Sequence, residues 1–365
     1  MTGFGVYVHI PFCARRCDYC DFATWTDRHH LMAAYAAACT TELRRRYESQ
    51  PVPPATSVFF GGGTPSLLPA ELLVGILDAI RRTGDAEVTV ECNPDTVTPE
   101  LLAAYRAGGV NRLSFGVQSM VPHVLAALGR THDPAGVARA VAAARGAGFD
   151  NFNVDLIYGA AGETPADWQA SLDAVLDLDP PHVSAYALTV EPGTPLARRI
   201  EAGAVDGPDD DDQAGKYLAA DAALTAAGRP WYEISNWSRP GRECRHNLLY
   251  WAQGEYLGVG CAAHGHTPAG RRWWNVRTPD RYIALVESGA PAEAGHEVLD
   301  GAGREREAAM LALRTRHGVA AGPAADGLVG DGLAERRGER VVLTPNGRLL
   351  ANEATTRLLL AHTGC

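Results

Sequence analysis

The chain has 365 residues, of which 46% are hydrophobic and 21% charged, and its formal net charge is −10. This length suffices for one large domain and one or two small ones with a real core. The negative charge argues against a nucleic-acid partner. Eight cysteines are too few for a disulfide framework, and no apolar run is long enough to cross a membrane. The opening segment lacks a signal-peptide layout, which predicts a reducing, cytoplasmic location and leaves peripheral membrane contact open.

Six short runs of β-branched and aromatic residues alternate with segments of helical periodicity. This alternation predicts a parallel sheet, and six units are too few to close an eight-stranded barrel. We therefore predict an α/β fold, an open (β/α)6 partial TIM barrel. The expected strands are 6–10, 57–60, 87–91, 112–117, 151–157 and 182–190. The expected helices are 31–48, 70–82, 99–107, 134–147 and 165–178, several of which start with a capping residue and a proline.

The pattern changes after residue 190. GPDDDD at 207–212 predicts the acidic start of a helix over 209–226, which is a simpler interpretation than a metal site. The tail predicts an amphipathic helix over 304–316, then a strand, a turn and a helix. Its nine arginines and eight acidic residues nearly cancel, so we expect a packing or interaction role rather than DNA binding. The predicted domains are the partial barrel (1–205), a C-terminal extension (206–299) and a small winged-helix-like module (300–365).

Three cysteines, Cys13, Cys17 and Cys20, form a C-x3-C-x2-C run directly after the first expected strand. A tetrahedral zinc site or a rubredoxin-like iron site needs four ligands. Three thiolates around a four-iron cluster instead leave one iron without a protein ligand, and an open iron can bind a small molecule. The alternative is a zinc site completed by Cys39 or His9, although neither stands at normal zinc-ligand spacing.

Other polar residues follow the same series of strands. GGGTP at 61–65 follows the second expected strand, where glycines let backbone groups approach a ligand closely; a plain tight turn is the alternative. Glu91 ends the third strand, Gln118 follows the fourth, and Asp155 lies near the end of the fifth. Because these strand ends meet at one mouth of a barrel, the sequence predicts a shared binding site there.

The strings HIPFC, GGGTP, FGVQSMVPHVLAALGRTH and NVDLIYG carry a family resemblance. On them the chain resembles the radical S-adenosylmethionine (SAM) superfamily, and within it the oxygen-independent coproporphyrinogen oxidase-like family. The resemblance implies a radical SAM-type barrel with a [4Fe–4S] cluster on the three cysteines and SAM at the open iron. It also implies SAM-binding residues, for each of which alone a structural role is the alternative: Tyr7, Gly62, Gly63, Thr64, Glu91, Gln118, Arg130 and Asp155.

Two features separate this chain from the true oxygen-independent coproporphyrinogen oxidases. Those enzymes carry another cysteine two residues after the triad, where this chain has Phe22. They also have a long N-terminal arm over the site, whereas here Tyr7 stands almost at the terminus. Both departures argue against decarboxylase activity.

HNLLYW at 246–251 is instead similar to a motif of the haem chaperones of this superfamily, and the match runs nearly end to end. This resemblance implies that His246, expected to be exposed and outside the six-strand barrel, is an axial haem ligand. Tyr250 and Trp251 would stack on the macrocycle. The alternatives are that Cys244 ligates haem or that the motif is structural. The other cysteines are expected to be free thiols: Cys39, Cys92, Cys261 and Cys365.

The sequence therefore predicts a haem chaperone that binds haem and passes it to an acceptor protein, for which a membrane haemoprotein is one candidate. The competing hypothesis is a radical SAM oxidoreductase acting on a porphyrinogen or another substrate, so enzymatic activity stays undecided. A plain electron-transfer role is disfavoured by the three-ligand cluster and the SAM-like pocket. A homodimer is one open oligomeric state.

Overall fold

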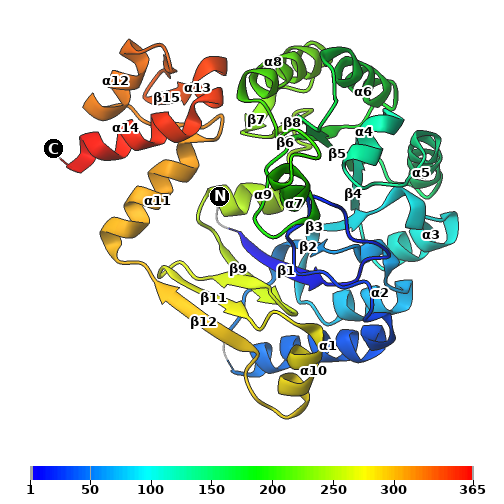
Figure 1. Cartoon of the computed structure of the whole chain (residues 1–365). Helices are drawn as coiled ribbons and strands as arrows, with labels where there is room; N and C mark the ends of the chain where they lie inside the picture. Colours follow the sequence, from blue (N-terminus) through cyan, green and yellow to red (C-terminus); the bar gives the residue numbers. More distant parts are fainter. Residues whose placement is uncertain (1–2, 50, 364–365) are drawn as a thin grey trace.

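Six parallel strands form an open partial barrel at the centre of the molecule (Figure 1). The structure, a computed structural model, describes residues 3–49 and 51–363. Each strand pairs in parallel with the next, and the first and last do not pair with each other, which confirms the predicted open (β/α)6 arrangement. The strands are β1 (Phe4–Ile10), β2 (Ala55–Gly62), β3 (Arg82–Cys92), β4 (Arg112–Gln118), β5 (Phe152–Tyr158) and β6 (His182–Ala187).

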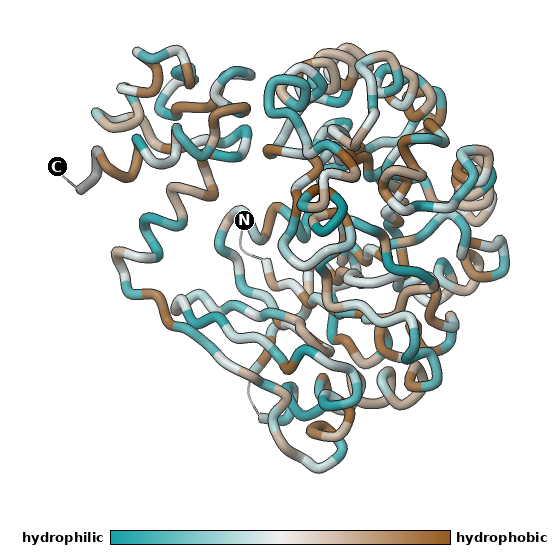
Figure 2. Tube along the Cα trace, in the orientation of Figure 1, coloured by the Kyte–Doolittle hydropathy of each residue, from teal (hydrophilic) through white to brown (hydrophobic). Residues whose placement is uncertain are grey.

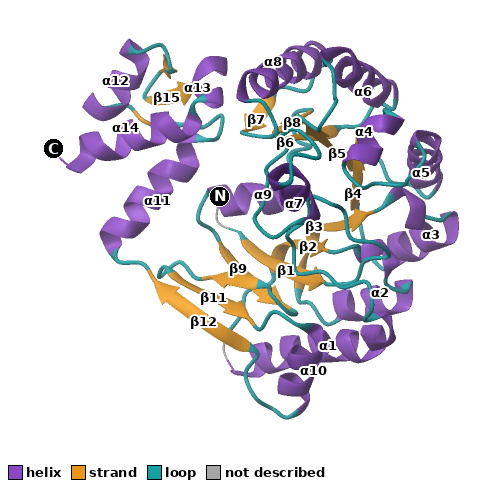
Figure 3. Ribbon diagram, in the orientation of Figure 1, coloured by secondary structure: helices purple, strands orange, loops and turns teal. Residues whose placement is uncertain are grey.

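Helices connect consecutive strands and cover the outside of the barrel (Figure 3). Several start at capping side chains, as expected; the Thr98 hydroxyl, for example, accepts a hydrogen bond from Leu101 N. The predicted helix 70–82 is too long, because Arg81 O accepts a hydrogen bond from Ala55 N (2.8 Å) and the chain has already joined the sheet. The helices are α1 (Met32–Ser49), α2 (Ala70–Asp78), α3 (Pro99–Ala107), α4 (Pro122–Ala127), α5 (Pro134–Gly146) and α6 (Pro165–Asp177), with 3-10 turns η1 (His29–Leu31), η2 (Pro65–Leu67) and η3 (Pro94–Thr96).

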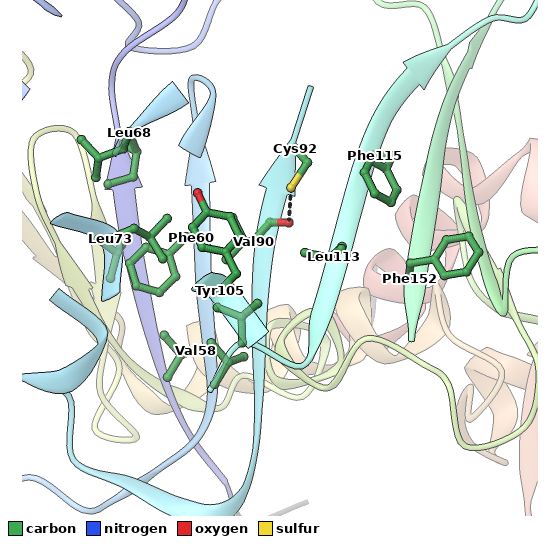
Figure 4. Packing of buried hydrophobic residues seen from close by; sticks show 14 of the residues in the cluster. Val58, Phe60, Leu68, Leu73, Val90, Cys92, Tyr105, Leu113, Phe115 and Phe152 are labelled. Carbon is green, nitrogen blue, oxygen red and sulfur yellow. Dashed lines mark hydrogen bonds between the residues drawn. The ribbon is translucent and has the colours of Figure 1, made fainter. Parts of the chain in front are cut away.

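Alternate residues of each strand point to opposite faces of the sheet. The outward side chains are hydrophobic and share one cluster with residues of the helices, as Figure 4 shows for Val58, Phe60 and Val90 beside Leu73 and Tyr105. Hydrophobic and hydrophilic residues correspondingly alternate along the outer helices in Figure 2. The inward side chains are mostly polar and include Tyr7, His9, Ser57, Glu87, Thr89, Glu91, Arg112, Ser114, Asn153, Asp155, His182 and Ser184. The barrel interior is therefore a polar environment enclosed by a hydrophobic shell.

The sheet continues beyond both edges of the barrel to twelve strands, in the order β12-β11-β10-β9-β1-β2-β3-β4-β5-β6-β8-β7. The added strands are β7 (Trp231–Glu233), β8 (Asn236–Ser238), β9 (Glu255–Val259), β10 (His264–His266), β11 (Arg271–Asn275) and β12 (Glu293–Val298). The helices of this part are α7 (Pro195–Glu201), α8 (Asp210–Ala226), α9 (Arg245–Trp251) and α10 (Pro279–Glu287). The side chain of Asp209 caps α8 by accepting from Asp212 N (2.8 Å), which confirms the predicted acidic helix start.

A separate C-terminal part follows, with its own three-stranded sheet, order β13-β15-β14. Its elements are α11 (Gly301–Leu313), β13 (Val319–Ala320), α12 (Pro323–Gly330), β14 (Ala334–Arg337), β15 (Arg340–Leu343), α13 (Pro345–Leu349) and α14 (Ala351–Thr363). Helix α11 starts and ends three residues earlier than predicted. It starts earlier because the Asp300 side chain caps it by accepting a hydrogen bond from Gly303 N (2.6 Å). Within the described residues, no helix is both long and apolar enough to span a membrane.

Candidate functional site

A cavity of about 540 Å³ opens at the carboxyl ends of the barrel strands. Polar and apolar residues at or after the carboxyl ends of all six strands line it. It brings together all of the candidate site residues except Tyr7 and His246, namely Cys13, Cys17, Cys20, Gly62, Gly63, Thr64, Glu91, Gln118, Arg130 and Asp155. The expectation that these strand ends meet at one mouth is confirmed.

The cysteine loop is held against the end of β1 by main-chain hydrogen bonds. Cys13 N donates to Trp25 O (3.0 Å), and Trp25 N donates back to Pro11 O (2.7 Å). Within the loop, Cys20 N donates to Cys17 O (3.2 Å). These bonds fix the backbone of the three cysteines without using their side chains, which remain available to a metal.

The thiols lie close enough to influence one another. Burial raises the pKa of Cys13, and the neighbouring Cys17 raises it further. Burial also raises the pKa of Cys20 to about 11, again with a contribution from Cys17. Bound iron cations reverse this effect because they favour thiolates. The Arg130 guanidinium, 3.6 Å from Cys17 Sγ, adds positive charge at the same place.

The thiols are not arranged for one metal ion. In residues 3–49 and 51–363, no group of three or more His, Cys, Asp or Glu side chains is arranged to hold a single metal ion. Cys39 is unexposed in the hydrophobic core, and His9 bonds to Tyr7 and to Ala23 O. Neither residue lines the cavity with the three cysteines, so neither is placed to complete a zinc site there.

Glycines 62 and 63 allow the chain to pass close to the cysteine loop. Gly62 has φ +111°, a conformation that favours glycine. A Cβ atom on Gly63 would lie 2.7 Å from Phe12 O and 3.1 Å from Cys13 Sγ. The GGGTP run is therefore more than a tight turn, since any side chain at Gly63 would displace the first cysteine.

Glu91 is a half-buried carboxyl without a cationic partner among the described residues. Its Oε2 accepts a hydrogen bond from Gly62 N (3.1 Å). Burial and the nearby Asp155 raise the pKa of Glu91 to about 8. A positively charged group in the cavity would lower this pKa and stabilise the carboxylate, so the site fits a ligand with an ammonium group.

Gln118 and Arg130 present donors to the cavity from the other side. Gln118 has φ +66°, an uncommon value for a residue other than glycine, at an irregularity in the pairing of β4 with β5. Arg130 donates to Gly116 O (2.5 Å), and its Nε has no partner among the described residues. A guanidinium and a side-chain amide are donors that suit a bound carboxylate.

Asp155 is held in place by hydrogen bonds from two neighbouring side chains. Its carboxylate accepts from Ser114 Oγ (2.9 Å) and Asn153 Nδ2 (2.7 Å). Burial raises the pKa of Asp155, and these hydrogen bonds offset part of that increase. The fixed carboxylate can accept hydrogen bonds from ligand hydroxyl groups.

His246 lies at the opposite end of the barrel. Its neighbour Ser57 precedes the cavity residue Gly62 by five positions in β2, or ~16 Å. The side chain is 1% exposed, with Nδ1 2.9 Å from Ser57 Oγ and Nε2 2.9 Å from Tyr250 OH. The expectation of an exposed histidine outside the barrel is wrong, because α9 packs into space left by Gly5, where a Cβ would lie 3.0 Å from His246 Cε1. Burial lowers the pKa of His246 to about 3, so its ring is neutral.

The aromatic residues around it do not share one surface. Tyr250 packs edge-on against His246 (4.8 Å between ring centroids) and Tyr256 (4.6 Å), whereas Trp251 hydrogen-bonds to Glu233. Tyr7 lies inside the barrel with its hydroxyl 3.1 Å from His9 Nδ1 and does not line the cavity.

The remaining cysteines within the described residues are free and buried: Cys39, Cys92, Cys244 and Cys261. Cys365 lies outside the described residues.

Several cavity residues escaped the sequence analysis. Thr189 and Glu191 follow β6, and His132 lies two positions after Arg130. The rule that polar residues gather after strand ends, applied to the sixth strand, could have found the first two. Nothing in the local sequence distinguishes His132 from a surface histidine.

Comparison with known proteins places the chain among radical SAM proteins. The model of the radical SAM superfamily matches residues 7–175. The chain is 44% identical over 371 residues to the heme chaperone HemW of Mycobacterium tuberculosis (strain ATCC 25618 / H37Rv), covering 98% of this chain and 95% of that protein. It is 36% identical to the heme chaperone HemW of Bacillus subtilis (strain 168), covering 95% and 97%.

A solved structure shares the fold. Coproporphyrinogen III oxidase (HemN) from Escherichia coli, a radical SAM enzyme, matches with a TM-score of 0.85 and 24% sequence identity, covering 98% of this chain and 90% of that one. At this identity the likeness concerns the fold alone.

Proposed function

The chain belongs to the HemW heme chaperones of the radical SAM superfamily, and on this premise we propose that it binds haem and delivers it to an acceptor protein. Membership of the superfamily implies a [4Fe–4S] cluster and SAM. The observation that carries the chaperone function is the 44% identity over 98% of the chain to a heme chaperone. Phe22, 61% exposed at the cavity, supports it further, since an oxidase of this family would have a cysteine there.

We assign the cluster to Cys13, Cys17 and Cys20 as thiolate ligands. The reduced cluster, when bound, supplies the electron that cleaves SAM in radical SAM enzymes. The chain's own contribution is to hold the backbone of the cysteine loop by main-chain hydrogen bonds and to leave room for Cys13 beside Gly63, where only a glycine fits.

We assign the SAM amino acid portion and ribose to the rest of the cavity. Glu91 holds the ammonium group, with backbone groups of residues 62–64 beside it, because its carboxyl has no cationic partner in the part of the chain that the structure describes. Gln118 and Arg130, which both line the cavity, hold the carboxylate with their amide and guanidinium donors. Asp155 accepts from the ribose hydroxyls. The predicted contact of Tyr7 with SAM stays a prediction, since Tyr7 does not line the cavity.

We place haem at α9, on the support of HNLLYW. The neutral ring of His246 is the form that ligates iron. Ligation requires the ring to exchange its hydrogen bond with Tyr250 or Ser57 for an iron bond, so haem binding should shift α9. The buried Cys244 is the alternative ligand, and burial raises its pKa to about 12, which disfavours the thiolate.

Anaerobic haem titration of cluster-loaded protein, with and without SAM, tests this proposal. The variant His246→Ala should shift the Soret band and weaken haem binding, and Cys244→Ala/His246→Ala should do so fully, because alanine offers no ligand. Ser57→Ala is the matched control: it removes one partner of the ring and leaves the ligand. Wild-type spectrum and affinity in the double variant would show that HNLLYW is structural.

The acceptor and the place of transfer belong to the same proposal. We propose a cytoplasmic protein that meets its acceptor, a haemoprotein, peripherally at the membrane surface, with a homodimer as one open state. Haem transfer from loaded protein to an apo-haemoprotein, measured with and without anionic lipid vesicles, tests this step. Formation of porphyrin from coproporphyrinogen in the same preparation would instead favour the oxidoreductase hypothesis.

A further inference from the structure

A line of hydrogen bonds runs through the barrel interior from the cavity to the start of α9. Asp155 Oδ1 accepts from Asn153 Nδ2 (2.7 Å), and Asn153 Oδ1 lies 2.6 Å from His182 Nδ1. His182 Nε2 lies 2.8 Å from the hydroxyl of Tyr232, which accepts from Cys244 N (3.3 Å). These residues come from β5, β6, β7 and the N-terminus of α9.

The orientation of the Asn153 amide fixes the direction of this line. Its Nδ2 faces three oxygens: Ser114 Oγ (2.7 Å), Asp155 Oδ1 (2.7 Å) and Ser184 Oγ (2.9 Å). A flipped amide would place its oxygen against the carboxylate of Asp155, which would repel it. The oxygen of Asn153 therefore faces His182, and His182 must carry its proton on Nδ1.

The remaining bonds follow from the chemistry of a neutral imidazole. His182 is unexposed, and burial and the nearby Arg112 hold its pKa well below the usual range, so the ring has one donor and one acceptor. With the proton on Nδ1, Nε2 accepts from the hydroxyl of Tyr232. Every donor in the line then points towards Asp155.

We propose that His182 is a positioning residue for the SAM site, which holds Asp155 in place through Asn153. The inference rests on the proposed function, because it takes Asp155 as the residue that binds the ligand ribose. His182 does not line the cavity and touches no ligand. It locks the amide of Asn153 in the one orientation that donates to Asp155, and Tyr232 locks the tautomer of His182.

Removing the donor at His182 leaves Asn153 Oδ1 without its partner, so the amide is held less firmly and its hydrogen bond to Asp155 weakens. His182→Leu should weaken SAM binding ~10-fold, the effect of about one hydrogen bond to a charged group. His182→Gln is the matched control, because its amide has one donor for Asn153 and one acceptor for Tyr232, and its affinity should stay within ~3-fold of wild type.

A comparison of ligands separates positioning from general damage. Calorimetry on cluster-loaded protein should compare SAM with its 2′-deoxy and 3′-deoxy analogues. Wild type and His182→Gln should prefer SAM to at least one analogue, and His182→Leu should lose that preference. Iron content and unfolding midpoint are measured for each variant, so that loss of the fold is recognised separately.

The tautomer gives a second readout that a packing role would not produce. In ¹⁵N-histidine-labelled protein with the oxidised cluster, the resonance absent from His182→Gln identifies His182. We expect this ring to be protonated on Nδ1, and Tyr232→Phe to shift its Nε2 resonance by removing the donor.

Three results would overturn the inference. They are an Nε2-protonated ring in wild type, a His182→Leu variant that still prefers SAM as wild type does, and a wild type that binds both deoxy analogues as tightly as SAM. Only the last result would also overturn the proposed role of Asp155. The other two would overturn the positioning role of His182 and leave the proposed SAM site standing.

Discussion

At the scale of one residue, the protonation state of Glu91 should depend on whether a positively charged ligand occupies the cavity. With a pKa of about 8, its carboxyl is mostly protonated at neutral pH when no cation is present. An ammonium group favours the ionised form and lowers this pKa. SAM binding near neutral pH should therefore release a proton, and affinity should rise with pH until the α-amino group of the ligand deprotonates at about pH 8.

Calorimetry at pH 7 in phosphate and in Tris, whose ionisation enthalpies differ, counts the protons released on binding. Glu91→Gln cannot ionise, so it should bind SAM more weakly, release fewer protons and keep its iron. Equal proton release by wild type and this variant would assign the ammonium to another residue.

The cluster assignment has its own residue-level prediction. Cys17→Ala should bind far less iron and sulfide after anaerobic reconstitution, because two thiolates do not hold a four-iron cluster firmly. Cys39→Ala is the control: this thiol is unexposed in the core and takes no part in the cavity, so iron should stay at the wild-type level. Loss of metal from the Cys39 variant would revive the zinc alternative.

At the scale of elements, the packing of α9 depends on the absence of a side chain at Gly5 of β1. A Cβ on Gly5 would lie 2.6 Å from Leu249 Cδ2 and 3.0 Å from His246 Cε1. Gly5→Ala should therefore push α9 away from the barrel and cost about 1–3 kcal/mol of the free energy of unfolding. Thermal and urea unfolding measure this cost.

Gly75 provides the matched control for that substitution. It lies within α2, and a Cβ there would meet no atom within 4 Å. Gly75→Ala should stabilise the protein by about 0.5–1 kcal/mol, since alanine loses less backbone entropy in a helix. A destabilised Gly75 variant together with an unaffected Gly5 variant would contradict the packing described for α9.

At the scale of the whole molecule, the C-terminal part has a hydrophobic core of its own, which includes Leu313, Leu328, Val341 and Leu358. This second core supports the proposed division into domains at 1–205, 206–299 and 300–365. The strands of 206–299 nevertheless continue the barrel sheet at both edges, so the first two domains share one sheet.

One partly buried ion pair joins the C-terminal part to α8. Arg348 donates two hydrogen bonds to Asp221 (2.8 and 2.5 Å), and its guanidinium stacks on Trp231. Arg348→Ala should cost about 2–4 kcal/mol, because it leaves a poorly solvated carboxylate unpaired. Hydrogen exchange should then accelerate in residues 300–363.

SAM binding should be unaffected in this variant, since every residue lining the cavity lies between 13 and 191. Arg357→Ala is the control, because its pairs with Glu353 and Asp331 are exposed and should matter little. Weaker SAM binding in the Arg348 variant would show that the C-terminal part acts on the cavity.

The sequence by itself determined the features that depend on neighbours in the chain. The cysteine spacing, the glycines after β2 and the capped helices are local patterns, and strand–helix alternation predicts which strand ends share a mouth. Glu91, Gln118 and Asp155 were therefore placed correctly at the cavity from their positions at or near the ends of the strands. The end of α2 was missed, because pairing of Arg81 with Ala55 is a long-range contact.

Only the tertiary structure decided what lies inside the barrel. The sequence predicts that His246 of the HNLLYW motif is exposed. In the structure it is buried against Ser57, 189 positions away in the chain. Asn153, His182 and Tyr232 have no local pattern either, and their hydrogen bonds span 29 and 50 positions. The physical reason is that burial and hydrogen-bond direction depend on groups brought together by folding, whereas periodicity records only which side of a strand or helix a residue occupies.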